Sequence, residues 1–256
     1  MNDDLLPATL TPEIHNLQGQ IALITGSSRG IGRAIAARLA GAGAGVIVHY
    51  HQNRPAAEEA ARATGAVRIV QSDLGSMSEI ERMASELQGT ELDMLVNNAG
   101  VWRLTPLGST KLETANEVLR TNVLGVFWLT QAVLPLLREG ARVVNISSVA
   151  GRTASPEGRS LYRASKAAVD AFTRNWALEL APRRIRVNAV APGIVETDLT
   201  AEHLASAETR QRLLSRHPLG KLGNAEEIAD AVWFLCSEAS RFVTGQSVNV
   251  SGGFVI

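Results

Sequence analysis

The segment Ile21-Ala-Leu-Ile-Thr-Gly-Ser-Ser-Arg-Gly-Ile-Gly32 gives the clearest indication of the fold. A continuously apolar run leads into a glycine-rich turn, and a helical pattern follows. A strand that is apolar on both faces is typical of a parallel sheet covered by helices on both sides. Backbone N–H groups in such a turn can approach a pyrophosphate, and the helix N-terminus favours its negative charge. The stretch therefore predicts a dinucleotide-binding turn.

The spacing of Gly26, Gly30 and Gly32 is Gly-x-x-x-Gly-x-Gly, which differs from the Gly-x-Gly-x-x-Gly of many dinucleotide folds. A tight turn without a ligand is the alternative interpretation. The position between a strand and a helix favours the nucleotide.

Short β-rich runs alternate with helical patterns along the rest of the chain. Strands are expected at Gln20–Thr25, Val46–Tyr50, Val67–Gln71, Asp93–Asn97, Arg142–Ser147, Ile185–Ala191 and Ser247–Val250. Helices are expected at Gly30–Ala42, Pro55–Ala63, Ser76–Gln88, Leu112–Leu137, Ser160–Ala181 and Ala225–Ser237. This alternation predicts a single-domain α/β protein with a Rossmann-type, doubly wound parallel sheet of about seven strands and helices on both faces. Residues 1–19 are expected to form an irregular extension, and residues 20–256 the domain itself.

The composition excludes several classes of protein. The 256 residues carry 25 basic and 25 acidic side chains without a basic stripe, which argues against binding to nucleic acid or an anionic membrane. No apolar run approaches the ~20 residues of a membrane span, and the N-terminus lacks the pattern of a signal peptide. Cys236, the only cysteine, is expected to be buried and inert. We therefore expect a soluble cytoplasmic protein.

The end of the second expected strand favours NADP over NAD. An acidic residue there would bind an unphosphorylated ribose and repel a 2′-phosphate. This chain reads His49-Tyr-His-Gln-Asn-Arg54 and has no acid before Glu58. Arg29 and Arg54 are expected near the same ribose. His49 and His51 alternate on one strand face, but no further metal-ligand cluster accompanies them, so no metal is expected.

Tyr162 and Lys166 lie four residues apart, on one face of an expected helix. A phenol titrates near ~10 and is a poor acid or base at neutral pH. A nearby cation favours the phenolate and lowers the pKa of the phenol. The pair is therefore a candidate acid/base centre, and a surface contact on an amphipathic helix is the alternative.

Further motifs accompany this pair. They are Asn97-Asn-Ala-Gly100, Asn122, Asn145-Ile-Ser-Ser148 and Pro192-Gly-Ile-Val-Glu-Thr197. With the glycine turn and Tyr162-x-x-x-Lys166, this set resembles the short-chain dehydrogenase/reductase family over about residues 18–253. The C-terminal segment Thr244-Gly-Gln-Ser-Val-Asn-Val-Ser-Gly-Gly253 makes the chain most similar to 3-oxoacyl-acyl-carrier-protein reductases.

The resemblance implies four catalytic residues. Tyr162 would give a proton to a carbonyl oxygen or remove it from an alcohol. Lys166 would lower the pKa of Tyr162 and hold the nicotinamide ribose. Ser148, rather than Ser147, would bind the same substrate oxygen. Asn122 would hold a water that links Lys166 to solvent.

The resemblance also implies the residues that bind the nucleotide. Those around the pyrophosphate and adenosine ribose would be Gly26, Ser28, Arg29, Gly30, Ile31 and Gly32. The 2′-phosphate would meet His51, and the adenine would meet Asp73 and Leu74. The remaining contacts, with Tyr162 and Lys166 among them, would run toward the nicotinamide through Asn98, Ala99, Gly100, Pro192, Gly193, Val195 and Thr197.

The sequence gives less information about the substrate than about the nucleotide. A lid is expected from Asp198 to about Pro218, with Trp102 and Arg103 at the entrance. Arg152 and Arg159 could meet an acidic substrate group, although solvated arginines are the default interpretation. Helix-end arginines, at positions 138, 183 and 184, could dock an acyl carrier protein or simply complement helix dipoles.

Three functions remain open on the sequence alone. An NADPH-dependent reductase, with 3-oxoacyl thioesters among its candidate substrates, is favoured. An NAD(P)-dependent alcohol, sugar or hydroxysteroid dehydrogenase is the enzymatic alternative. A non-catalytic nucleotide-sensing protein is the alternative from another class, but it has no need of the four catalytic residue types. The family resemblance also implies a homotetramer.

Overall fold

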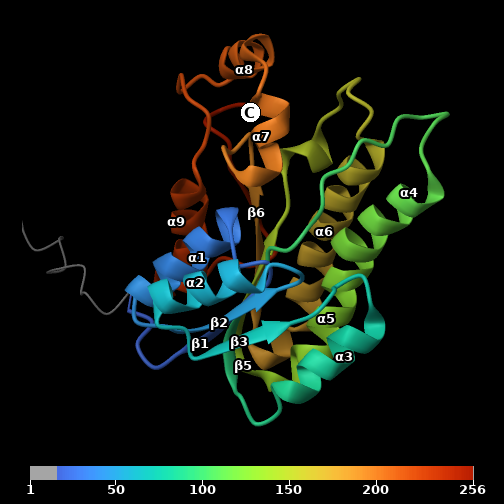
Figure 1. Cartoon of the computed structure of the whole chain (residues 1–256). Helices are drawn as coiled ribbons and strands as arrows, with labels where there is room; N and C mark the ends of the chain where they lie inside the picture. The colour runs from blue at the N-terminus through green and yellow to red at the C-terminus, as the bar shows by residue number, and fades with distance from the viewer. Residues whose placement is uncertain (1–15, 256) are drawn as a thin grey trace, which may run out of the picture.

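A seven-stranded parallel sheet forms the centre of the molecule (Figure 1). The computed structural model describes residues 16–255. The strands lie in the order β3-β2-β1-β4-β5-β6-β7. Their bounds are β1 (Ile21–Ile24), β2 (Gly45–Tyr50), β3 (Arg68–Gln71), β4 (Leu92–Asn97), β5 (Leu137–Ile146), β6 (Arg186–Pro192) and β7 (Ser247–Val250). The predicted fold class is confirmed.

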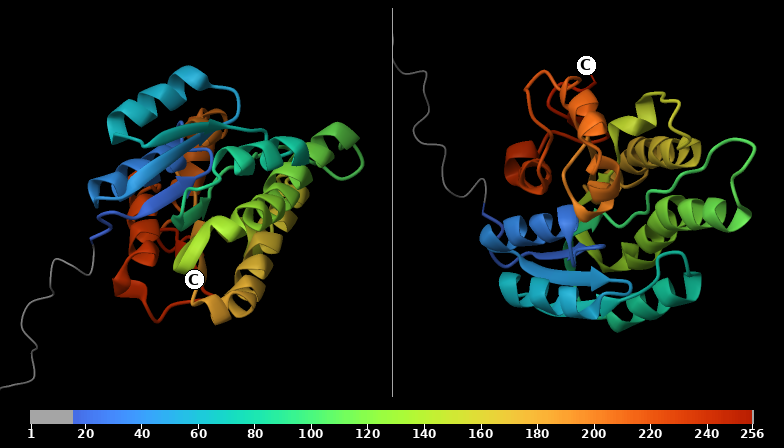
Figure 2. Two further views of the ribbon diagram at one scale, coloured as in Figure 1. Left: turned by 90° about the horizontal axis from the view of Figure 1, so that it is seen from below. Right: turned by 45° about the horizontal axis from the view of Figure 1, so that its top comes forward.

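Helices cover both faces of the sheet (Figure 2). One face is covered by α1 (Gly30–Gly41), α2 (Arg54–Thr64) and α9 (Ala225–Cys236). The other is covered by α3 (Met77–Glu86), α5 (Val126–Val133) and α6 (Ser160–Glu179), and α4 (Leu112–Leu119) packs against α6. Parallel strands need such crossover helices, which explains why the strands are apolar on both faces.

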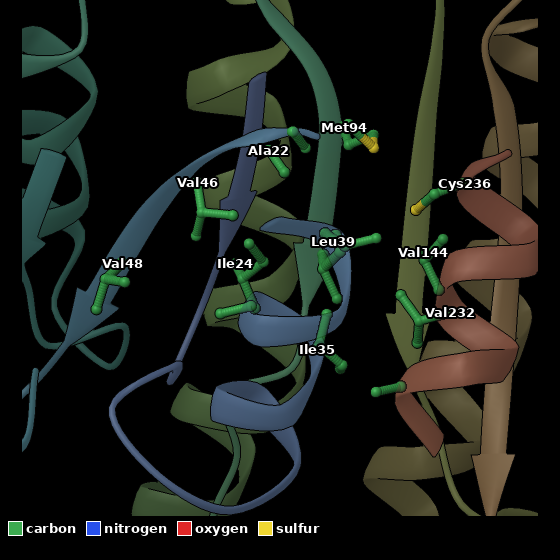
Figure 3. Close-up of a cluster of buried hydrophobic side chains, with 14 of the residues drawn as sticks. Ala22, Ile24, Ile35, Leu39, Val46, Val48, Met94, Val144, Val232 and Cys236 are labelled. Carbon is green, nitrogen blue, oxygen red and sulfur yellow. The ribbon is translucent and has the colours of Figure 1, made fainter. Parts of the chain in front are cut away.

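Two hydrophobic clusters hold these layers together, one on each face of the sheet. Figure 3 shows part of the first cluster, where Leu39 of α1 lies near Ile24 of β1 and Val232 of α9. Each fully buried side chain of this size contributes roughly 1.5–3 kcal/mol. Cys236 belongs to the same cluster, and burial raises the pKa of its thiol to about 12, as expected for an inert cysteine.

The helix expected over Leu112–Leu137 is the main error of the prediction. After α4 the chain forms a π-helix, η2 (Arg120–Gly125), then α5 and a short 3₁₀ turn, η3 (Leu134–Leu136). Pro135 cannot donate a backbone hydrogen bond, and the helix ends there. The strand expected from Arg142 begins at Leu137 instead. Its first part was missed because residues 138–140 are exposed and polar.

Two short helices occupy the segment expected to form a lid. These are α7 (Asp198–Leu204) and α8 (Ala207–Leu214), which stand beyond the end of β6 in Figure 1. Whether they close over a ligand stays a prediction.

Two further expectations concern the irregular N-terminal extension and the absence of membrane-spanning helices. Most of the predicted irregular extension, residues 1–15, lies outside the described residues. In its last part Leu17 is buried, and its N–H donates to the Ala42 carbonyl. Between residues 16 and 255, no helix has the length and apolar character needed to span a bilayer.

Gly125 provides a test of the packing between η2 and the β3–α3 loop. A Cβ atom at Gly125 would overlap the carbonyl oxygen of Leu74, whereas one at Gly41 would meet nothing within 4 Å. We expect Gly125→Ala to lower the free energy of unfolding by about 1–3 kcal/mol. Gly41→Ala should leave it unchanged or raise it by up to about 1 kcal/mol. Urea unfolding followed by circular dichroism measures both; equal stability of the two variants would contradict this packing.

Candidate active site

Lys166 is buried and Tyr162 is half-buried, so the interpretation of the pair as a surface contact is wrong. Both residues are in the first two turns of α6, and the Lys166 ammonium lies 5.9 Å from the centroid of the Tyr162 ring. Lys166 is only 6% exposed. Its Nζ donates to the carbonyl of Ile146, the last residue of β5, over 2.8 Å. The pair therefore sits against the carboxyl end of the central sheet.

A buried carboxylate compensates the buried ammonium. Burial lowers the pKa of Lys166 to about 8, and Asp170, one turn further along α6, acts against this by favouring the charged form. Asp170 is 4% exposed and accepts hydrogen bonds from Arg152 Nε at 3.1 Å and Ser247 Oγ at 2.9 Å. These contacts fix α6 to β7 and to the short helix η4 (Val149–Arg152), which follows Ser148. Asp170 was not predicted, because its hydrogen-bond partners Arg152 and Ser247 lie 18 and 77 residues away in sequence.

The pKa of Tyr162 differs from the expectation. Burial raises it, and a hydrogen bond with Ser148 and the charges of Arg163 and Arg159 lower it in part. The expected lowering by Lys166 is not among these effects. The Lys166 ammonium instead donates to the Ile146 carbonyl and lies over the ring of Tyr162.

The two neighbouring serines have different environments. Ser148 bonds with Tyr162, and its Oγ lies 3.5 Å from the carbonyl oxygen of Pro192. Ser147 donates instead to the backbone carbonyl of Lys166 at 3.2 Å. Ser148 is therefore the serine that the structure brings together with Tyr162, in agreement with the prediction.

Asn122 lies in the π-helical segment η2 and is buried. Its Oδ1 accepts from Val101 N–H at 2.8 Å, and its Nδ2 donates to the Val101 carbonyl and to Ser165 Oγ. A Cβ placed on Gly100 would touch Asn122 Oδ1 at 3.2 Å and Lys166 Nζ at 3.7 Å. Asn122, Gly100 and Lys166 thus meet at one point, although the Asn122 side chain is already occupied. A π-helical turn inside an α-helix is frequent at functional sites.

The glycine turn is held by a buried histidine. Gly26 and Gly30 have φ angles of +62° and +52°, which favour glycine. The Gly26 N–H donates to His49 Nδ1 at 2.9 Å. The imidazole proton must therefore reside on Nε2, which lies 3.0 Å from Ser72 Oγ. Burial lowers the pKa of His49 to about 4, so the ring is neutral and can accept this bond.

The segment after β4 closes the other side of the turn. Asn98 Nδ2 donates to the Thr25 carbonyl at 2.8 Å, and Thr25 Oγ1 accepts from the N–H groups of Asn98 and Ala99. The side chain of Asn98 is thus used to shape the turn. Asn97 bridges β4 to β5 by donating to Asn145 Oδ1 at 2.9 Å.

Two of the residues expected at the adenosine end, His51 and Asp73, lie close together. His51 Nε2 is 3.9 Å from Asp73 Oδ2, and Asp73 Oδ1 accepts from the Gly75 N–H. Arg54 pairs with Glu58 on α2. Arg29 is exposed at the start of α1 and forms no ion pair within residues 16–255. The same part of the chain contains no cluster of three or more potential metal ligands.

The segment after β6 faces the glycine turn. A Cβ on Gly30 would lie 3.7 Å from the Thr197 side chain, so the two segments nearly touch. The Gly193 N–H donates to the Val250 carbonyl, and Val195 is buried. Of the other expected nucleotide contacts, Ser28, Gly32 and Leu74 are buried or nearly so, and Ile31 packs against the core.

The substrate side of Tyr162 is aromatic and basic. The Trp102 ring lies 6.3 Å from the Tyr162 ring and 5.2 Å from His203 of α7, edge to face in both cases. The Arg159 guanidinium stacks over Trp102. Arg103 and Arg152 do not join this group, since Arg103 pairs with Glu117 and Arg152 with Asp170.

Comparisons with known proteins give the family of the chain. A family model described as enoyl-(acyl carrier protein) reductase matches residues 26–255. The 3-oxoacyl-[acyl-carrier-protein] reductase FabG of Aquifex aeolicus is 42% identical, covering 93% of this chain and 98% of the relative. A dehydrogenase/reductase from Sinorhizobium meliloti is 33% identical with a TM-score of 0.90, covering 96% and 98% of the two chains. A short-chain dehydrogenase from Burkholderia cenocepacia, solved in complex with NADP, is 35% identical with a TM-score of 0.87, covering 93% and 99%.

His49 offers a test of how the glycine turn is held. We expect His49→Leu to weaken NADPH binding about tenfold or more, because the Gly26 N–H loses its buried acceptor. His49→Asn places an oxygen near the former Nδ1 and should stay within about threefold of the parent protein. Fluorescence titration measures the affinity. Tight binding by the leucine variant would show that the turn does not need this bond.

Proposed function

The chain belongs to the short-chain dehydrogenase/reductase family, and we propose that it reduces a carbonyl group to a secondary alcohol with NADPH and Tyr162 as general acid. The observation that carries this proposal is the close group of Ser148, Tyr162 and Lys166, in which the serine and the lysine are buried and the tyrosine is half-buried. Burying the Lys166 ammonium is costly, so a lysine with only a structural role would not need to lie there.

The proton comes from Tyr162. Its raised pKa keeps the phenol protonated at neutral pH, which suits a proton donor in carbonyl reduction. The Ser148 hydroxyl already bonds with Tyr162, so both groups can face one substrate oxygen and stabilise its developing charge. Arg159 and Arg163 favour the phenolate that remains after the transfer.

Lys166 and Asn122 return a proton to Tyr162 after the transfer. The ammonium lies beside the Tyr162 ring and is held by the Ile146 carbonyl. Because the side chain of Asn122 is bound to Val101 and Ser165, its backbone is the part left to hold a water between Lys166 and solvent. The π-helical turn at Asn122 supports this role, since it alters the backbone hydrogen bonding.

The residues present fit NADP. The glycine turn presents backbone N–H groups at the start of α1, and glycines with positive φ leave room for close approach. No acidic residue ends β2, and His51 and Arg29 are exposed where the 2′-phosphate is expected. The NADP complex of the similar Burkholderia cenocepacia enzyme supports this choice. When bound, NADPH supplies the hydride.

A 3-oxoacyl thioester is the finer proposal for the substrate, supported by the similarity to the Aquifex aeolicus reductase. The three arginines expected to dock a carrier protein all have partners within the chain, and Arg184 pairs with Glu139. Arg183 donates to backbone carbonyls of Leu134 and Leu137, and Arg138 pairs with Glu91. An acyl carrier protein therefore stays a proposed partner without a defined docking site. Alcohol, sugar and hydroxysteroid substrates remain the alternative.

A homotetramer also remains a proposal. The family resemblance implies that the helices around residues 112–137 and 160–181 form one interface, and apolar side chains are exposed there, namely Leu112, Leu119, Leu124 and Leu178. Covering such side chains in an assembly would be favourable.

Tyr162→Phe tests the proposed acid. We expect NADPH oxidation with 3-oxoacyl thioesters, diketones or quinones to fall at least about a hundredfold, because the proton donor is lost. NADPH affinity should stay within about threefold. Tyr50, the only other tyrosine, lies in the core at the end of β2, and Tyr50→Phe is the matched control with nearly normal turnover. Normal turnover of Tyr162→Phe would refute the assignment.

A further inference from the structure

Arg159 lies on the substrate side of Tyr162, immediately before α6. Its guanidinium stacks 3.9 Å above the Trp102 ring, and that ring lies 6.3 Å from the ring of Tyr162. The Arg159 side chain is only 12% exposed. Thr105 pairs with Arg159 as an isolated parallel bridge, which ties the segment after Trp102 to the start of α6. The guanidinium is therefore fixed in position beside the proposed acid.

Among residues 16–255, only one nitrogen of the Arg159 guanidinium donates a hydrogen bond. Arg159 Nη1 donates to Glu157 Oε2 at 2.8 Å. Within residues 16–255, Nε and Nη2 have no hydrogen-bond partner, and neither is fully shielded from solvent. The edge formed by Nε and Nη2 is one of the two edges of arginine that bind a carboxylate through two parallel hydrogen bonds. The structure thus holds an open, preorganised donor pair next to Tyr162.

The charges around Arg159 favour an anion. Glu157 accepts from both Arg159 and Arg212, so one carboxylate is shared by two cations. Arg163 adds a third positive charge, and its Nη1 is committed to the Thr153 backbone and hydroxyl. His203 of α7 lies nearby, and burial lowers the pKa of its imidazole, so this ring is mostly neutral at neutral pH. The cluster therefore keeps a positive excess beside Tyr162.

We propose that Arg159 is a substrate-binding residue that selects carbonyl compounds carrying a carboxylate. Nε and Nη2 donate hydrogen bonds to the substrate carboxylate, while the substrate carbonyl group faces Ser148 and Tyr162. The Trp102 ring, which stacks against the guanidinium, fixes its orientation and limits the width of the substrate site. This inference rests on the proposed carbonyl reduction and names the class of substrate that the same site prefers.

The test compares oxo acids with their methyl esters. Acetoacetate and levulinate serve as the acids, and calorimetry measures the binding of each acid and ester to the NADP-saturated protein. Steady-state NADPH oxidation gives kcat/KM for the same compounds. We expect the protein to prefer the better-fitting acid over its ester at least about tenfold, as two charge-assisted hydrogen bonds require.

Three variants assign this preference to the open donor pair. Arg159→Gln should reduce the acid-to-ester ratio of binding and of kcat/KM at least about tenfold. Arg159→Lys should keep only part of this ratio, because lysine retains the charge but cannot donate two parallel hydrogen bonds. Arg212→Gln removes the other cation on Glu157 and should change the ratio less than about threefold, since its side chain is half-exposed. NADP affinity reports whether each variant is folded.

The outcomes separate this inference from the proposed function. An unchanged ratio in Arg159→Gln, or equal binding of acids and esters by the parent protein, overturns the inference. An acid preference in binding that depends on Arg159, without any turnover, supports the anion subsite and contradicts the proposed reduction. Turnover of esters and acids alike would support the reduction alone and overturn the carboxylate preference.

Discussion

The burial of the Lys166 ammonium is the constraint on which the site depends. A charge with 6% exposure is tolerated only when hydrogen bonds and an opposite charge compensate it. The Ile146 carbonyl and Asp170 do so, and both are fixed by the sheet: Ile146 ends β5, and Asp170 is bound to Ser247 of β7. The position of Tyr162 follows from this, because it lies one turn before Lys166 on the same helix.

The sheet topology explains why distant segments meet there. The strand order reverses between β1 and β4, and in open α/β sheets ligands bind in the crevice at such a switch point. The glycine turn after β1 and Gly100 after β4 lie on either side of it. The segment after β6 closes the crevice, since Thr197 nearly touches Gly30. The fold thus provides the nucleotide crevice, and α6 brings Tyr162, the proposed proton donor, to its edge.

Sequence reasoning predicted what depends on local pattern. Apolar runs predicted all seven strands, and short motifs predicted Ser148, Asn122, Tyr162 and Lys166 as one group. It failed where distant contacts decide the structure. Residues 138–140 of β5 are exposed, and the pairing of Leu137 with Leu92 is not visible in sequence. The role of His49 depends on Gly26, which is 23 residues away. The raised pKa of Tyr162 follows from burial, which a sequence does not reveal.

The pH dependence of carbonyl reduction in Asp170→Asn tests the central claim most directly. Asp170 raises the pKa of Lys166, which burial has lowered to about 8. Loss of this carboxylate should therefore lower the pKa of Lys166 further and move the alkaline fall of kcat/KM to lower pH. Arg152→Gln keeps the Asp170 charge and should not move it in that direction. An alkaline limb that is unchanged in Asp170→Asn, or that moves to higher pH, would contradict the account.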